Sequence, residues 1–313
     1  MRKIKNYLSL VKFSHTVFAM PFALIGFFLG IFGSSHGRQW NLNKAIGWDI
    51  SITPGWHTTI YPKWFLPLKF ILVLLCMIFA RSAAMAFNRW LDKNFDAKNP
   101  RTAIREIPAD IIKANNALWF VVISCLLFIL CTYFINKICF YLSPVALFVV
   151  LFYSYTKRFT ALCHLVLGVG LSLAPIGAYL AVTGQFALLP ILFSFTVLFW
   201  VSGFDIIYAL QDEEFDKTNQ LHSIPAALGK TKALRVSELL HLLSVACVIY
   251  AGLYGHFGIW YWIGVALFMG LLIYQHTLVK PNDLSKVNMA FFTTNGIASV
   301  VFAIFVILDL FLN

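Results

Sequence analysis

Charged side chains are scarce in this sequence, and acidic ones are scarcer still. Asp, Glu, Lys and Arg make up 12% of the 313 residues, with 13 acidic against 24 basic residues. A soluble globular domain usually contains about 25% charged residues. The basic residues are spread over short segments between apolar runs, so the formal charge of +11 does not indicate a nucleic-acid partner. We attribute it to membrane topology and to attraction for anionic lipids and ligands.

Cysteine and histidine motifs are also missing. None of the six cysteines belongs to a CxxC pair, and none of the eight histidines stands near another at the spacing of metal ligands. The sequence therefore lacks the signatures of a zinc site and of a thiol redox site. All six cysteines lie within or at the ends of apolar runs, so we interpret them as small buried apolar side chains.

Long apolar runs are abundant, because 60% of the residues are hydrophobic. Each run is long enough to cross a hydrocarbon core of roughly 30 Å, and spanning segments of this length must be helical. The first run lacks a clear small-residue cleavage site, so we interpret it as a retained span. We expect an all-α, polytopic membrane protein of one domain, residues 1–313, with nine transmembrane helices. The runs cover about 14–33, 65–90, 115–135, 138–156, 162–182, 189–210, 236–254, 257–278 and 288–311.

The distribution of Lys and Arg predicts the orientation. If the N-terminus is cytoplasmic, 18 basic residues fall in inside segments and 5 in outside segments, with Arg81 left within a span. Basic residues concentrate on the cytoplasmic side of membrane proteins. We therefore expect a cytoplasmic N-terminus and, after nine spans, a C-terminus outside.

Seven of the thirteen acidic residues fall in two stretches, each at the end of an apolar run. An offset of 120 residues superimposes a polar residue followed by Asp at +4 and +8 in both stretches. On a helix, positions i, i+4 and i+8 share one stripe and rise about 6 Å per step. The first triplet is Asn88, Asp92 and Asp96; the second is Tyr208, Asp212 and Asp216.

Two such stripes, facing each other near the cytoplasmic surface, predict a cavity lined by carboxylates. A charge at mid-bilayer costs roughly 2.5–3.5 kcal/mol, and like charges on one stripe repel, so the acids require a compensating charge. Oxygen ligands of this kind suit Mg²⁺, which binds one or two carboxylates together with substrate phosphates. The alternative is a solvated cluster that ends a helix, but the repetition at one side of the membrane favours a functional site.

Basic residues stand close to both stripes. Arg101 and Arg105 follow the first stripe in "NPRTAIREIP", and Lys157 and Arg158 lie in another inside loop, "YSYTKRF". Carboxylates, Mg²⁺ and a ring of Lys and Arg are what a diphosphate group requires.

Arg81 lies on the stripe of Asn88 but about 10 Å deeper by helix rise. An arginine within a span needs an anionic partner. Two alternatives remain open for Arg81: a structural ion pair with Asp205, which is similarly deep in its own span, and an anchor for an anionic group of a substrate.

These stretches resemble the motifs of a known family. "NRWLDKNFDAKNPRT" and "QDEEFD" are similar to the two aspartate motifs of UbiA-superfamily intramembrane prenyltransferases. The order of "RSAAMAFNRWLD", "YSYTKRF", "DIIYALQDEEFD" and "HSIPAALG" is most similar to the 4-hydroxybenzoate polyprenyltransferase branch, and the similarity covers nearly the whole chain.

The resemblance implies nine helices around a central cavity open to the cytoplasmic face. It implies Mg²⁺-dependent transfer of a polyprenyl group from a polyprenyl diphosphate to an aromatic acid such as 4-hydroxybenzoate, in quinone biosynthesis, by an enzyme in contact with membrane lipid. We expect the inner membrane of a bacterium. The implied catalytic residues are Asp92, Asp96, Asp212 and Asp216; the metal ligands are these and Asn88; the substrate-binding residues are Arg81, Lys157, Arg158, Arg101, Arg105, Tyr153, Asp205 and Tyr208.

Two features depart from the family pattern. Arg89 stands where many members have a second Asp, although it points about 100° away from the stripe. The outside loop 34–64 is longer than expected, and its aromatic residues suggest an interfacial cap.

Other functions stay open. Within the superfamily, the acceptor can instead be a dihydroxynaphthoate, a haem, a chlorophyllide or a lipid glycerol. From another class, an intramembrane cation transporter also carries acids within its spans, but it places them near the midplane, often with inverted repeats. Here the acids gather at one face beside Lys and Arg. A purely structural membrane protein has no need of such a cluster. Gly26 and Gly30 fit a GxxxG pattern, and residues 168–178 are rich in small residues; packing within one chain and dimerisation both explain this.

Overall fold

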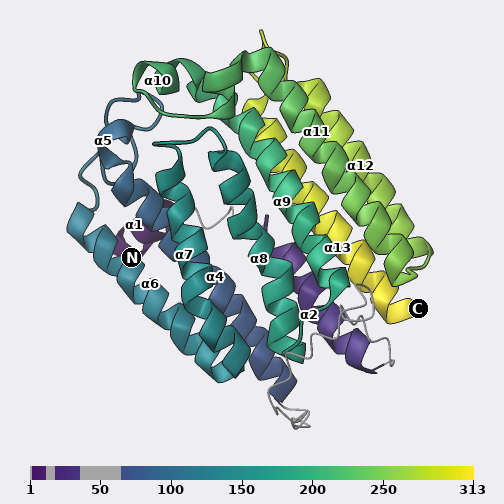
Figure 1. Ribbon diagram of the computed structural model, residues 1–313. Coiled ribbons are helices and arrows are strands. Elements are labelled where there is room, and N and C mark those ends of the chain that lie inside the picture. The colour runs from purple at the N-terminus through teal and green to yellow at the C-terminus, as the bar shows by residue number, and fades with distance from the viewer. Residues whose placement is uncertain (1, 12–17, 36–64) are drawn as a thin grey trace.

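The computed structural model describes residues 2–11, 18–35 and 65–313, and these residues are almost entirely helical (Figure 1). No β-strand occurs among them. The helices are α1 (Arg2–Leu10), α2 (Met20–Ser35), α4 (Phe65–Leu91), α5 (Lys93–Asp96), α6 (Ala114–Ile135), α7 (Lys137–Thr156), α8 (Cys163–Thr183), α9 (Leu188–Ala209), η2 (Leu210–Asp212), α10 (Glu213–Thr218), α11 (Ile224–Gly255), α12 (Ile259–Leu278), the π-helix η3 (Met289–Thr294) and α13 (Asn295–Leu312).

The all-α membrane architecture is confirmed. Within the described ranges, eight helices are long and apolar enough to cross a membrane, and α2 contributes a shorter apolar helix, Met20–Phe32. The predicted first span, 14–33, corresponds to α2 but begins in residues that lie outside the described ranges. Nearly all of the loop 34–64 also lies outside them, so its interfacial cap stays a prediction.

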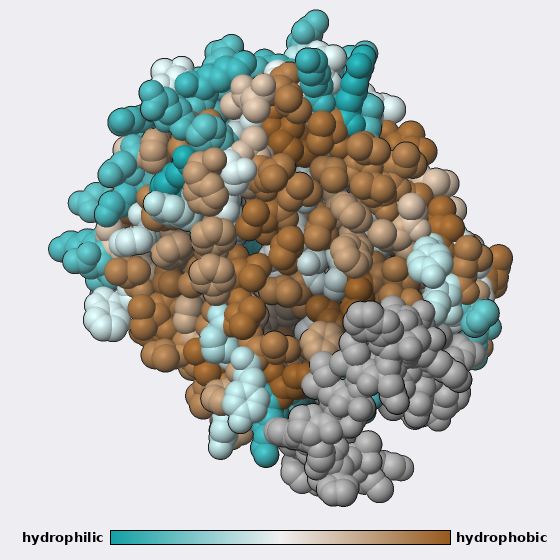
Figure 2. Space-filling view, viewed as in Figure 1, coloured by the Kyte–Doolittle hydropathy of each residue, from teal (hydrophilic) through white to brown (hydrophobic). Residues whose placement is uncertain are grey.

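The membrane helices pack into one bundle. Helix α8 contacts α2, α7 and α9, while α9 contacts α11, and α12 packs on α13. The short helices α5 and α10 lie at the same end of the bundle (Figure 1). Figure 2 shows an apolar surface over the middle of the bundle and hydrophilic residues gathered at the end that carries α5 and α10. This end is therefore the polar face from which the acidic stretches are reached.

Glycines allow α8 to approach two of its neighbours closely. A Cβ atom on Gly26 of α2 would lie 2.0 Å from the carbonyl oxygen of Pro175 in α8. A Cβ on Gly168 of α8 would lie 2.3 Å from Oγ of Ser202 in α9. The small residues noted in the sequence thus serve contacts between helices of the same chain.

Candidate active site

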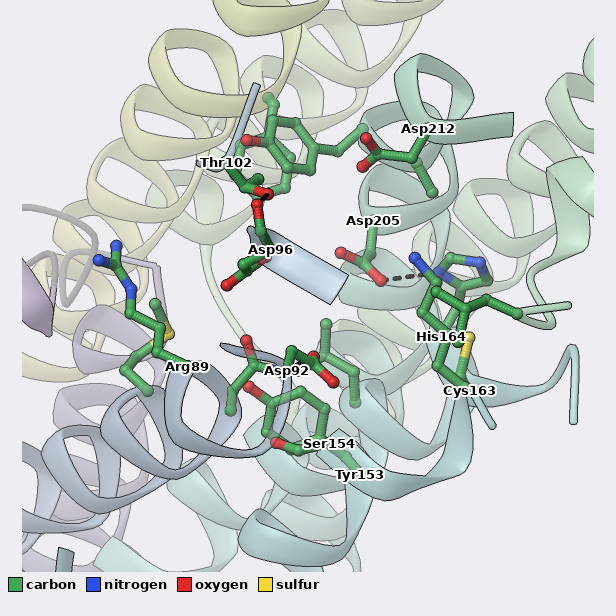
Figure 3. Close-up of a pocket in the computed structure, with 18 of the residues that line it drawn as sticks. Arg89, Asp92, Asp96, Thr102, Tyr153, Ser154, Cys163, His164, Asp205 and Asp212 are labelled. Carbon is green, nitrogen blue, oxygen red and sulfur yellow. Dashed lines mark hydrogen bonds and ion pairs between the residues drawn. The ribbon is translucent and has the colours of Figure 1, made fainter. Parts of the chain in front are cut away.

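A cavity of about 290 Å³ opens between the two acidic stretches. Residues of α4, α5, α7, α8, α9 and α10 line it, together with the segment that follows α5 and two phenylalanines of η3. Every site residue predicted from the sequence lines this cavity except Arg158, whose guanidinium instead bonds the carboxylate of Asp92. Figure 3 shows carboxylates from α5, α9 and the two helix breaks around one open space.

The two motifs have the same local structure. Asp92 lies between α4 and α5 with φ −91° and ψ 5°, and Asp212 lies at the start of α10 with φ −104° and ψ 5°. Both values fall in the bridge region, where a regular helix is interrupted. The backbone amide of Asp96 still donates to the carbonyl of Asp92 at 2.8 Å. The stripe inferred from the sequence is therefore retained across the local break in the first motif.

Basic side chains neutralise the first motif. Asp92 pairs with Arg158 at 2.7 Å, and Asp96 pairs with Arg105 at 2.8 Å. The amide Nδ2 of Asn88 donates to Asp92 Oδ2 at 3.2 Å, so these two predicted metal ligands are in contact. Burial raises the pKa of Asp92 even though Arg158 lies beside it.

The second motif is neutralised in the same way. Asp212 binds Arg101, which also donates to the hydroxyl of Tyr208 at 2.8 Å. The carboxylate of Asp216 is buried and pairs with Lys157 at 2.7 Å. Burial lowers the pKa of Lys157, but the charge of Asp216 outweighs that effect and the pKa of the ammonium is raised.

This pairing differs from the sequence-based expectation. The sequence suggested a metal ion as the partner of the acids and assigned the bases to a diphosphate. In the structure, each of the four motif aspartates meets one Lys or Arg. Arg101 and Arg105, which follow α5, fold back over the cavity toward Asp212 and Asp96. Lys157 and Arg158, which follow α7, reach Asp216 and Asp92.

The donors suit a hard divalent cation. The motif residues supply carboxylate and amide oxygens, which is the ligand chemistry of Mg²⁺. Within the described ranges, no three His, Cys, Asp or Glu side chains already converge as a closed metal site. A set of this kind fits a cation that shares its coordination with oxygens of a substrate.

The structure distinguishes the two alternatives for Arg81. Asp205 pairs with His164, whose Nδ1 lies 2.7 Å from the carboxylate oxygen Oδ2. The expected alternative, an ion pair between Arg81 and Asp205, is therefore not formed. Nε of Arg81 is buried without a hydrogen-bond partner among the described residues, although the side chain lines the cavity. Tyr153 of α7 lines the same region.

Several residues of the site were not found from the sequence. His164 lines the cavity from α8, and Asn99 donates to Asp212 at 3.1 Å. Arg89, noted as a departure from the family pattern, forms a buried ion pair with Glu106. That pair ties the segment 97–112 to α4. Only Asn99 had a local signal, because it lies between the first stripe and Arg101.

Aromatic rings form one wall of the cavity. The ring of Phe291 lies 4.2 Å from that of Tyr208 and 5.2 Å from that of Phe204, measured between centroids. Phe18 closes the group, at 5.7 Å from both Phe204 and Phe291. All four residues line the cavity. We call them the aromatic wall.

A π-helix positions Phe291 in this wall. In η3 the backbone carbonyls of Ala290 and Phe291 accept from the side-chain amide of Asn295, at 3.1 and 2.9 Å. Gln275 also donates to the carbonyl of Ala290 at 3.0 Å, and Trp200 donates to Oδ1 of Asn295 at 3.0 Å. Buried amide side chains thus satisfy backbone carbonyls within this irregular turn. π-Helical turns are frequent at functional sites.

Comparison with known proteins places the chain in a family. Residues 53–297 match the model of the UbiA prenyltransferase family. The chain is 31% identical over 237 residues to a 4-hydroxybenzoate octaprenyltransferase of Nitrosomonas europaea, covering 76% of this chain and 81% of that protein. It is 28% identical over 231 residues to the enzyme of the same name from Francisella tularensis subsp. mediasiatica, covering 74% and 81%.

Solved structures share the fold. The apo structure of a UbiA homologue from Aeropyrum pernix K1 has a TM-score of 0.77 at 28% identity, covering 94% of this chain and 98% of that one. A UbiA homologue from Archaeoglobus fulgidus, solved with DMAPP and Mg²⁺, has a TM-score of 0.65 at 19% identity, covering 98% of this chain and 100% of that one. The match over most of the chain, the paired aspartate motifs and the shared helical fold agree: the chain belongs to the UbiA prenyltransferase family of membrane-embedded transferases.

Proposed function

We propose that this protein transfers a polyprenyl group, with Mg²⁺, from a polyprenyl diphosphate to an aromatic acid of the 4-hydroxybenzoate type in quinone biosynthesis. One observation carries the proposal above the others. A single cavity holds two aspartate motifs with their Lys and Arg partners at one end, and an arginine with an unpaired buried Nε further in. The names of the curated relatives and the DMAPP and Mg²⁺ bound to the Archaeoglobus fulgidus homologue support the same chemistry.

We call the end of the cavity that holds the two aspartate motifs the motif end. Its residues suit a diphosphate group bound to a metal ion. Asn88, Asp92, Asp96, Asp212 and Asp216 would hold the metal ion. When bound, Mg²⁺ supplies positive charge to the departing diphosphate. The basic partners of the aspartates, Arg101, Arg105, Lys157 and Arg158, would then move from carboxylate to phosphate oxygens, an exchange between ligands of similar geometry and charge.

The opposite end of the cavity, which holds Arg81 deeper in the bundle, suits the carboxylate group of an acceptor. Arg81 precedes Asp92 by eleven residues on α4, which corresponds to about 16 Å of helix rise. That separation is too large for a ligand of the diphosphate. A carboxylate at Arg81 forms a charge-assisted pair and satisfies the buried Nε. Tyr153 also lines this cavity and would contact the acceptor.

The reaction joins the two ends. The allylic C–O bond of the prenyl diphosphate breaks, and its electron pair leaves with the diphosphate. A carbon of the electron-rich acceptor ring then bonds to the allylic carbon, and loss of the ring proton restores aromaticity. The aromatic wall would shield the allylic cation from water and stabilise it through the ring faces.

We also propose that the motif end faces the cytoplasm of a bacterial inner membrane, in contact with membrane lipid. The excess of Lys and Arg in the segments at that end supports this orientation. Lys98 and Thr218 are exposed at the motif end, and Gln185 is exposed between α8 and α9 at the other end. Cysteine introduced at Lys98 or Thr218 should resist an impermeant thiol reagent applied to intact cells, whereas cysteine at Gln185 should react. Labelling of either motif-end cysteine from outside contradicts the orientation.

A product assay tests the proposed reaction. Membranes containing the protein are incubated with Mg²⁺, prenyl diphosphates of several lengths and a panel of acceptors, and the products are identified by mass spectrometry. We expect a prenylated aromatic acid. Exclusive prenylation of a dihydroxynaphthoate, a haem or a lipid glycerol would assign another acceptor, and Mg²⁺-driven ion flux without any product would favour a transporter.

A further inference from the structure

The proposed diphosphate and acceptor sites do not use the pair of His164 and Asp205, although the family resemblance implies that Asp205 binds a substrate. His164 of α8 is buried, while the Asp205 side chain of α9 is 23% exposed and lines the cavity. Figure 3 shows the Asp205 carboxylate directed toward the space between the motif aspartates, with the imidazole behind it.

The hydrogen bonds define how His164 holds Asp205. The backbone amide of Ile224, at the start of α11, donates to Nε2 of His164 at 3.4 Å. A nitrogen that accepts this bond carries no proton, so the neutral ring has its proton on Nδ1. Nδ1 then donates to Oδ2 of Asp205 at 2.7 Å. The imidazole therefore fixes one oxygen of the carboxylate, Oδ2.

Asp205 differs from the motif aspartates in its partner. Each of those four pairs with Lys or Arg, whereas Asp205 pairs with a histidine. Its second oxygen, Oδ1, makes no hydrogen bond with any described residue. Among the five aspartates that line the cavity, only Asp205 meets no Lys or Arg of the described ranges. Its free Oδ1 is therefore the cavity carboxylate oxygen most open to a proton from a bound acceptor.

Its depth matches the acceptor ring. Asp205 precedes Asp212 by seven residues, so by helix rise it lies about 10 Å deeper in the bundle than Asp212. Arg81 lies about 16 Å inside the level of Asp92 on α4 by the same measure. The depths of Arg81 and Asp205 therefore differ by about one helical turn, which is about the length of a benzene ring. An acceptor whose carboxylate is bound by Arg81 would present its ring at the level of Asp205.

We propose that Asp205 is the general base that removes the ring proton of the acceptor, and that His164 positions it. The inference rests on the proposed function. After the ring carbon has bonded to the allylic carbon, the C–H bond at that carbon breaks. Its electron pair returns to the ring, and the proton goes to Oδ1 of Asp205. No further oxidant, reductant or co-reactant enters this step.

Asp205→Asn tests the base, because the amide preserves shape but accepts a proton poorly. The purified protein is assayed with Mg²⁺, a prenyl diphosphate and the acceptor, either unlabelled or deuterated at the ring positions beside the hydroxyl. We expect kcat to fall on the order of 10²-fold, as for loss of a general base. The kinetic isotope effect should rise above the wild-type value, because proton loss becomes rate-limiting. Asp205→Glu should recover part of the rate.

Binding of inorganic pyrophosphate with Mg²⁺, measured by calorimetry, separates the base from the diphosphate site. We expect a Kd for Asp205→Asn within threefold of wild type. Loss of this binding would place Asp205 in the diphosphate site and overturn the proposal. A kcat within threefold of wild type, or a slower reaction with an unchanged isotope effect, would overturn it as well.

His164 provides the positioning test. His164→Ala should lower kcat and raise the isotope effect, whereas His164→Gln, whose amide can still donate to Asp205, should restore much of both. Equal losses in the two variants with no change in isotope effect would reduce His164 to a structural role. Asp110→Asn is the matched control, because Asp110 is an exposed loop carboxylate whose positive φ of 53° suits asparagine.

The wild-type assay separates this inference from the function on which it rests. If the wild type forms no prenylated aromatic product, the proposed function fails and the base fails with it. If the wild type forms the product and Asp205→Asn does so equally fast, only the base is wrong.

Discussion

Asp92 and Asp212 occupy equivalent positions in the two halves of the site, each at the break between a long membrane helix and a short polar one. Their backbone conformations agree closely, with φ of −91° and −104° and ψ of 5° in both. Because α5 and α10 lie at the same end of the bundle, the two breaks direct carboxylates into one cavity (Figure 1). The 120-residue offset in the sequence thus corresponds to a structural repeat.

The equivalence predicts that the two aspartates are equally necessary. Asp92→Ala or Asp212→Ala should each reduce prenyl transfer by at least about 10²-fold, because each removes a carboxylate that would hold the Mg²⁺ needed to offset the charge of the departing diphosphate. EDTA should abolish the wild-type activity. Asp283→Ala, in an exposed loop, is the control. Full activity of either motif variant, with normal membrane insertion, would contradict the metal-diphosphate assignment.

Lys157 should matter for stability as well as for activity. Its ammonium is the charged partner of Asp216, whose side chain is fully buried. Lys157→Met leaves that carboxylate uncompensated, which should destabilise the ligand-free protein by about 1–3 kcal/mol. Thermal unfolding in detergent measures the change. Mg²⁺ with inorganic pyrophosphate should restore less stability to the variant than it adds to wild type, because one phosphate contact is lost. An unchanged melting temperature would contradict this prediction and would show that water replaces Lys157 as the partner of the Asp216 carboxylate.

The sequence was sufficient for the membrane-spanning helices and for most of the charged residues that line the cavity. Apolar runs identify membrane spans because a bilayer demands about twenty apolar residues per helix. The motif aspartates were found because their spacing repeats. These features are local in the chain, so a single sequence contains them.

Contacts between distant segments could not be predicted. His164 and Asp205 meet because Gly168 lets α8 approach Ser202 of α9, whose hydroxyl donates to the carbonyl of His164 at 3.1 Å. Nothing in the spacing of the sequence reports that approach. The pairing of each motif aspartate with its own base likewise depends on how the segments after α5 and α7 fold against the cavity. The π-helix of η3 requires side chains from α9 and α12, which no local pattern indicates.

The aromatic wall gives a prediction about side reactions. Phe291→Leu removes a ring that contacts Tyr208 and Phe204 while keeping the site apolar. We expect kcat to fall roughly 3–30-fold, the range of a cation–π contact of about 0.5–2 kcal/mol. The share of prenyl diphosphate hydrolysed to prenol should increase, because water reaches the cation. Phe311→Leu, at an exposed position near the end of α13, is the control. The assignment fails if both variants give the same ratio of prenol to prenylated product.

Arg81 gives the test of the acceptor site. In the proposed acceptor site, its guanidinium would bind an acceptor carboxylate through two hydrogen bonds in one plane, which the single ammonium of lysine does not reproduce. Arg81→Lys should therefore raise the KM for the aromatic acid at least about tenfold, equivalent to about 1.4 kcal/mol, and change the KM for the prenyl diphosphate far less. Asp205 already pairs with His164, so the substitution does not leave that carboxylate without a partner. The folding yield should therefore stay near the wild-type value. Steady-state kinetics with each substrate varied in turn decide the matter. Equal changes in both KM values, or a loss confined to expression, would refute the anchor, because a structural role weakens the whole site rather than one of its two ends.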